Sequence, residues 1–155
     1  MVKRTSLEGD SCPVARALDA IGDWWSLLII REAFLGLRRF SQFQRSLGLA
    51  KNILAVRLRA LVDRGILTME PASDGSVYRD YVLTPKGRGL FPILVALGQW
   101  SEAFDDRPAE IATVLVDRES GRPVQKLALF AQDGRPLGSA DTTLKPRFPV
   151  PEVSG

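Results

Sequence analysis

The 155-residue chain contains no histidine and a single cysteine, Cys12. The absence of histidine excludes Ser-His-Asp and Cys-His catalysis and every zinc site that needs a histidine ligand. One cysteine per chain excludes an internal disulfide and a cysteine-only zinc site, which suits a reducing compartment. We therefore expect a cytoplasmic protein with no metal, no cofactor and no catalytic residues.

Long apolar runs are also missing. The first ten residues lack the apolar core of a signal peptide, and runs such as 27–30 and 90–97 are too short to span a bilayer. Apolar residues nevertheless make up 45% of the chain, enough for a buried core. We predict no membrane partner and three segments: a flexible N-terminus (1–11), a main domain (12–106) and a C-terminal extension that contains a β-hairpin (107–155).

Apolar spacing predicts two helices near the N-terminus. Pro13 suits a first helical position, and Val14, Leu18 and Ile21 then recur at helical intervals. After Gly22, Asp23 is predicted to cap a second helix that is apolar on nearly all sides. We expect this second helix to be the central buried one.

Two further helices and a hairpin are predicted next. Ser41, followed by a glutamine three residues later, resembles a capping box and predicts a short helix that Gly48 ends. A longer helix follows from about Lys51 to Arg64, with leucines at i, i+4 and i+7. Two strands, 66–70 and 77–83, flank an Asp-Gly turn and form a hairpin.

This order of elements, ending in a two-stranded hairpin, is that of a winged helix-turn-helix, so we predict a mainly α member of the α+β class. Between Arg31 and Arg64, eight basic and two acidic residues give a net charge of +6, although the whole chain carries only +3. A basic block of this kind is typical of a surface that binds a polyanion. A solvated helix surface would have the same composition.

The longer helix combines an apolar inner face with a polar outer face, as a helix that enters the major groove requires. Lys51 and Asn52 lie in its first turn, where base edges are usually contacted. Arg57 and Arg59 are two positions apart, so at most one points into the groove and at least one is expected to hold phosphate. Ser41 is more simply interpreted as a helix cap. The predicted contacts with a double-stranded operator are Arg38, Arg39, Ser41, Gln42, Lys51, Asn52, Ala55, Arg57, Arg59, Ser76 and Arg79, with Ser73 beside them on the hairpin tip.

A fifth helix is predicted to begin at Thr84-Pro85 and to be kinked or divided by Pro92. It carries more apolar surface than one small core covers, which favours a homodimer. After Asp106 the composition changes. The segments 112–116 and 123–130 are predicted to be strands joined across residues 119–121, and Asp133-Gly134 marks another turn.

Several ordered motifs resemble the HxlR family of bacterial regulators. They span about residues 12–104 and are residues 12–22 (CPVARALDAIG) followed by Trp25, 39–43 (RFSQF), 54–61 (LAVRLRAL), 65–67 (GIL) and 81–88 (YVLTPKGR). The resemblance implies a transcription regulator, with repression as our expected mode, that dimerises through its N-terminal helix and its long C-terminal helix. The expected interface residues are Val14, Leu18, Leu94, Leu97, Trp100 and Phe104.

Cys12 occupies the position at which several members of that family carry a redox-sensing cysteine. It precedes a helix N-terminus, where partial positive charge favours the thiolate, and Arg16 lies one turn on. Oxidation or an electrophile would then alter the dimer and change DNA binding. The alternative is a small buried residue without a sensing role. The extension also resembles those of longer members, but it lacks their cysteines, so a zinc ribbon is not supported.

Three other functions remain open from the sequence. A winged helix can serve protein–protein assembly, although the charge of the helix at 51–64 favours DNA. A regulator can also respond to a small aromatic ligand, here among Trp24, Trp25, Phe91 and Trp100. An enzyme is disfavoured because the acidic residues are scattered and no phosphate loop is present.

Overall fold

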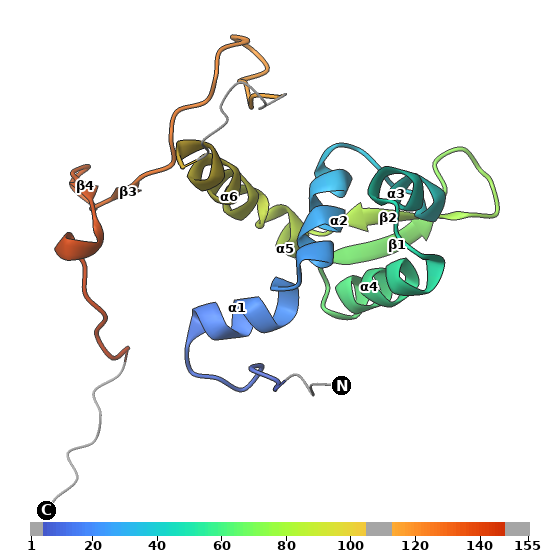
Figure 1. Cartoon of the computed structure of the whole chain (residues 1–155), viewed down its shortest axis with the longest axis horizontal. Coiled ribbons are helices and arrows are strands. Elements are labelled where there is room, and N and C mark those ends of the chain that lie inside the picture. The colour runs from blue at the N-terminus through green and yellow to red at the C-terminus, as the bar shows by residue number, and fades with distance from the viewer. Residues whose placement is uncertain (1–4, 105–112, 148–155) are drawn as a thin grey trace, which may run out of the picture. The chain divides into compact units, whose positions relative to one another are not determined.

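The computed structural model describes residues 5–104 and 113–147, which belong to two compact units, Met1–Gly98 and Gln99–Gly155. The mainly helical α+β class is confirmed (Figure 1). The elements are α1 (Pro13–Ile21), α2 (Trp24–Phe34), α3 (Phe40–Leu47), α4 (Lys51–Asp63), β1 (Leu67–Pro71), β2 (Arg79–Leu83), α5 (Pro85–Arg88), α6 (Phe91–Ala103), β3 (Leu129–Phe130), β4 (Pro136–Leu137) and a 3-10 turn, η2 (Ser139–Asp141).

Local chemistry explains where the first helices begin and end. Pro13 is the first residue of α1, and Asp23 caps α2, because its Oδ1 accepts a hydrogen bond of 2.9 Å from the Ser26 amide. Gly48 ends α3 with φ at 64°, a left-handed conformation that glycine adopts without strain. These predictions from the sequence are confirmed, and the tight turn at Gly48 brings α4 close behind α3.

The predicted capping role of Ser41 is wrong. Helix α3 begins at Phe40, one residue before Ser41, and Ser41 lies exposed within the first turn of the helix. The Gln42 side chain reaches back instead, and its Oε1 accepts hydrogen bonds from the Arg38 and Arg39 amides at 2.9 and 3.0 Å. One glutamine thus satisfies two backbone donors ahead of the helix, and no serine cap is needed.

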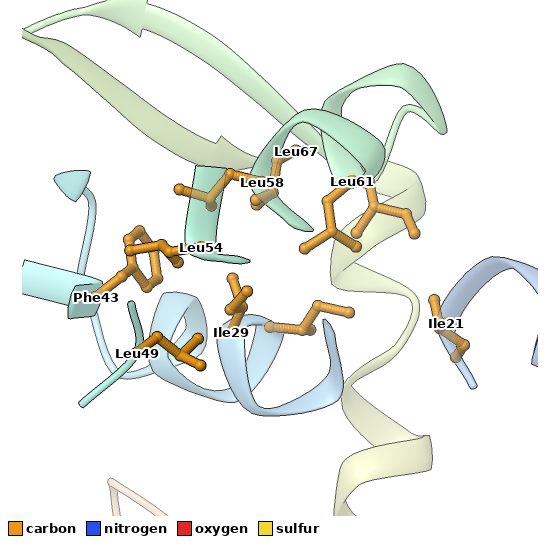
Figure 2. Packing of buried hydrophobic residues seen from close by; sticks show 10 residues of the cluster. Ile21, Ile29, Phe43, Leu49, Leu54, Leu58, Leu61 and Leu67 are labelled. Atoms are coloured by element: carbon orange, nitrogen blue, oxygen red, sulfur yellow. The ribbon is translucent and has the colours of Figure 1, made fainter. Parts of the chain in front are cut away.

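A compact apolar core lies where α2, α3, α4 and the start of β1 meet. Figure 2 shows Phe43, Ile29 and Leu54 directed toward one another, with Leu58 beside them. Each of these four side chains is fully buried. The prediction that α2 is the central helix is confirmed, because it packs against α1, α3, α4 and β2. The core fixes the orientation of α4, and therefore which of its residues face outward.

The wing is the antiparallel hairpin of β1 and β2, in which Leu67 is opposite Leu83 and Pro71 is opposite Arg79. Its strands are one or two residues displaced from the predicted ranges. The Tyr81 amide donates a hydrogen bond of 2.7 Å to the Arg38 carbonyl, so the hairpin is tied to the segment that leads into α3. The loop between the strands projects beyond α3 (Figure 1).

The fifth predicted helix is divided, as Pro92 suggested. Thr84 caps the short helix α5, because its Oγ1 accepts a 3.0 Å hydrogen bond from the Gly87 amide. Gly87 is buried so closely against the start of the wing that a Cβ there would stand 2.2 Å from the Ile66 carbonyl oxygen. Helix α6 then starts at Phe91, with Pro92 in its first turn, where the missing amide proton is tolerated.

The strands predicted in the C-terminal extension are only partly formed. Residues 113–115 and 124–128 are not in strands, but residues 129–130 are, and the predicted connection across residues 119–121 is confirmed by an antiparallel bridge between Val116 and Pro123. The hairpin of β3 and β4 forms instead around Asp133-Gly134, where Gly134 has φ at 87°. Ala112 lies outside the described residues. Short apolar runs do not fix strand position, whereas a glycine with positive φ does fix the turn.

Candidate nucleic-acid interface

Helix α4 divides cleanly into a buried and an exposed face. Leu54, Leu58 and Leu61 are completely buried. Helical geometry turns the opposite face outward, and Asn52, Ala55, Val56 and Arg59 are exposed there, while Lys51 is exposed at the N-terminal end of the helix. Val56, with 62% of its surface exposed, is not among the predicted contacts. Its spacing of four residues from Asn52 was the signal that places it on this face.

Arg57 has a partner within the chain. Its Nε lies 3.5 Å from Oδ1 of Asp23, the residue that caps α2. The side chain is only partly exposed and lies on the flank of α4, away from the stripe that contains Asn52 and Arg59. Of the two arginines that the sequence could not separate, Arg59 therefore faces outward, and Arg57 links α4 to α2.

The approach to α3 presents several polar groups. The side chains of Arg38, Ser41 and Gln42 are exposed. None of the ion pairs within the described parts of the chain involves Arg38. Because Gln42 uses its carbonyl oxygen to accept from the backbone, only its amide protons remain for an external acceptor.

Arg39 holds the wing. Its Nη2 lies 2.6 Å from Oδ2 of Asp74 in the hairpin loop, and its Nε lies 3.5 Å from Oδ1 of the buried Asp80. Its guanidinium also stands 5.9 Å from the centre of the Tyr78 ring. The hydrogen bond from Arg39, reinforced by bonds from Ser76, lowers the pKa of Asp74 to about 2. Arg39 was predicted to contact DNA, and neither aspartate was predicted to pair with it.

The wing tip lies beside these groups. The Ser76 amide donates a 3.0 Å hydrogen bond to Oδ1 of Asp74, which shapes the loop. Ser73 donates to Oδ2 of Asp80 from both its amide and its hydroxyl at 3.3 Å. Arg79 is exposed, and it lines a cleft together with Ser41 and Tyr78. Predicted contacts from the start of α3 and from the wing therefore share one surface.

Cys12 is the residue immediately before α1 and is exposed in the single chain. Its amide donates a 2.8 Å hydrogen bond to Oδ1 of Asp10, and its carbonyl accepts from the Arg16 amide at 3.2 Å. The predicted helix-terminal position is therefore confirmed, and the thiol is not buried in the core of the chain. This geometry leaves the sulfur accessible to a reagent.

The expected dimer residues differ in exposure. Val14 and Leu18 on α1 are 65% and 53% exposed. On α6, Leu97, Trp100 and Phe104 are exposed, whereas Leu94 is half-buried and packs against the core. Leu94 therefore serves the fold of the single chain, and the other five leave apolar surface in contact with solvent.

The aromatic residues of the predicted ligand site form separate ring pairs. Trp24 pairs with Trp25 at 5.0 Å between ring centres, and Phe91 pairs with Phe34 at 5.2 Å. In the C-terminal unit, Trp100 pairs with Phe104 at 6.1 Å. Trp24 and Trp100 nevertheless remain 70% and 67% exposed. None of the helices in ranges 5–104 and 113–147 has both the length and the apolarity needed to cross a membrane.

Comparison with known proteins gives a consistent result. The family model of the HxlR-like helix-turn-helix matches residues 20–108. The uncharacterized HTH-type transcriptional regulator Rv3095 of Mycobacterium tuberculosis is 37% identical over 139 residues, which cover 90% of this chain and 87% of that protein. Both similarities include α2, α3, α4 and the wing.

Solved structures extend the comparison. The crystal structure of PA1607, described as a candidate transcription factor, is 55% identical, with a TM-score of 0.86, and the match covers 91% of this chain and 99% of that one. The redox regulator HypR in its reduced form is 31% identical, with a TM-score of 0.56, and the match covers 63% of this chain and 98% of HypR. The match to PA1607 therefore extends into the C-terminal unit. Nearly all of HypR, by contrast, matches only 63% of this chain.

Proposed function

The chain belongs to the HxlR-like family of helix-turn-helix transcriptional regulators, and we propose that it binds one DNA sequence as a homodimer, with α4 in the major groove. The observation that carries the proposal is the division of α4, whose buried leucines hold the helix while Asn52 and Arg59 face outward. Asparagine pairs with adenine and arginine or lysine with guanine through two hydrogen bonds, so this face has the chemistry of base recognition.

Phosphate contacts complete the proposed interface. Arg38, Ser41 and the amide protons of Gln42 approach one strand from the start of α3, and Arg79 approaches the backbone from the wing. Ser76, whose hydroxyl oxygen is buried, shapes the wing loop instead. Arg39 positions the wing through Asp74 and Asp80, and Arg57 positions α4 through Asp23. We assign these two arginines to the scaffold rather than to DNA because their charges are already paired.

Binding measurements with matched variants test this proposal. Wild-type protein is titrated with a duplex selected by the protein from a random library and with a scrambled duplex, at several salt concentrations. We expect tight binding to the selected duplex that weakens as salt increases. Replacing Lys51 and Asn52 with alanine removes the preference and leaves weak binding to both duplexes. The variant Gln125→Ala with Lys126→Ala, an adjacent amide and cation in the C-terminal unit, retains it. Equal affinity for both duplexes in wild type overturns the proposal.

We also propose that Cys12 makes DNA binding responsive to oxidants or electrophiles and that the regulator acts as a repressor. The exposed thiol before α1 and the similarity to a protein described as a redox regulator support this. Diamide is expected to change operator affinity in wild type but not in Cys12→Ser, and reporter expression is expected to rise when the gene is deleted. An identical diamide response in both proteins contradicts the sensing role, and a fall in expression contradicts repression.

A further inference from the structure

The outermost stripe of α4 contains an apolar residue between its polar ones. Asn52, Val56 and Arg59 follow one another at spacings of four and three residues, which places them on one face of the helix. Together with Ala55 and Ala60 they line a groove on the outer side of α4. Val56 is 62% exposed in the middle of this stripe. A β-branched side chain slightly lowers helix propensity, so the stability of an exposed helix does not explain a valine at this position.

We propose that Val56 is a specificity-determining residue that recognises thymine through its C5-methyl group. This inference rests on the proposed function and assigns one base type to one side chain. In the major groove, thymine differs from every other base by this methyl group, which is recognised by contact with an apolar group of a side chain. Asn52 and Arg59 on either side form hydrogen bonds to base edges or phosphates, and Val56 reaches the same groove wall between them.

The surrounding charges favour DNA as the occupant of this face. Arg59 is exposed on it, and Lys51 is exposed at the N-terminal end of the same helix. One carboxylate, Asp63, also lines the groove. At 1.5 Å per residue it lies about 10 Å further along the axis than Val56, in the last turn, beyond the half of a recognition helix that contacts bases.

A scan with deoxyuridine, which pairs like thymidine but lacks the methyl group, isolates this contact. In the duplex selected by the wild-type protein, each thymine is replaced in turn, and affinity is measured by fluorescence anisotropy. Loss of one buried methyl contact is expected to weaken wild-type binding about fourfold at one thymine in each half-site. In Val56→Ala the same replacement has no effect, and Val56→Thr, which keeps one methyl group in place, retains part of it.

The outcomes separate this inference from the function on which it rests. If no duplex is preferred over a scrambled one, the proposed function and the inference both fail. If a duplex is preferred but deoxyuridine has no effect at any position, or weakens Val56→Ala as much as wild type, the inference alone fails. Thermal unfolding of Val56→Ala is expected to match wild type, because the side chain lies outside the core. Its loss of methyl sensitivity then reflects recognition and not misfolding.

Discussion

At the scale of single residues, one face of α4 packs in the core and the other faces solvent, and stability measurements distinguish the two faces. Leu58 is completely buried in the core, and Val56, two positions away, is mostly exposed. Leu58→Ala is expected to lower the free energy of unfolding by about 2–5 kcal/mol, because it removes apolar contacts and leaves a cavity. Val56→Ala is expected to change it by less than about 0.5 kcal/mol. Urea denaturation measures both, and equal losses contradict the assigned orientation of α4.

Asp74 in the wing loop makes the stability of the fold depend on pH. Its pKa is lowered from 3.8 to about 2 in the folded chain by the hydrogen bond from Arg39. A carboxylate with a lowered pKa stabilises the fold at pH values above its ordinary pKa, and the contribution is lost as the pH falls through 3.8 toward 2. The free energy of unfolding is therefore expected to fall less steeply over this range in Asp74→Asn than in wild type. Parallel curves for the two proteins contradict the ion pair in solution.

At the scale of elements, close packing between α5 and the start of the wing depends on one glycine. Gly87→Ala is expected to destabilise the fold by more than about 2 kcal/mol, because its Cβ would overlap the backbone carbonyl of Ile66. Gly48→Asn is the matched control, since Gly48 has open space around it and asparagine tolerates positive φ. Its cost is expected to stay below about 1 kcal/mol. Differential scanning calorimetry compares the two, and an equal or larger loss in Gly48→Asn contradicts the packing.

Elements with strong helical spacing were predictable from the sequence. The leucines of α4 and the cap at Asp23 identified their helices correctly. The start of α3 was misplaced because a serine with a glutamine three residues later is a weak signal for a cap. In the structure the cap comes from Gln42, inside the helix, which accepts hydrogen bonds from two preceding amides.

Features set by contacts between distant residues were not predictable. The aspartates that hold the wing are far from Arg39 in sequence, so no local pattern indicated their contact with it. The strands of the extension were predicted too long because short apolar runs do not fix where a strand begins, whereas Gly121 and Gly134, both with positive φ, marked the two turns correctly.

At the scale of the whole molecule, the exposed apolar residues of α1 and α6 predict self-association. A charge introduced at Val14 would be buried in the proposed dimer without a partner, so Val14→Glu is expected to weaken dimerisation by about tenfold or more. Val77→Glu, on the wing, is the control because Val77 is 95% exposed and lies outside the proposed interface. Sedimentation equilibrium measures both variants. A wild-type monomer, or an undiminished dimer in Val14→Glu, contradicts the interface.

The central claim is that the first turn of α4 enters the major groove of a selected DNA site, and disulfide cross-linking tests it most directly. Ala55→Cys, on the exposed side of α4 and three residues after Asn52, is made in the Cys12→Ser background, so that the chain carries one thiol and keeps Lys51 and Asn52. It is combined with selected duplexes that bear a thiol tether in either the major or the minor groove. The account predicts a cross-link to the major-groove tether within the selected site and none to the minor-groove tether. Equal cross-linking to both tethers, or none to the major-groove tether in a duplex that the protein still binds, would contradict it.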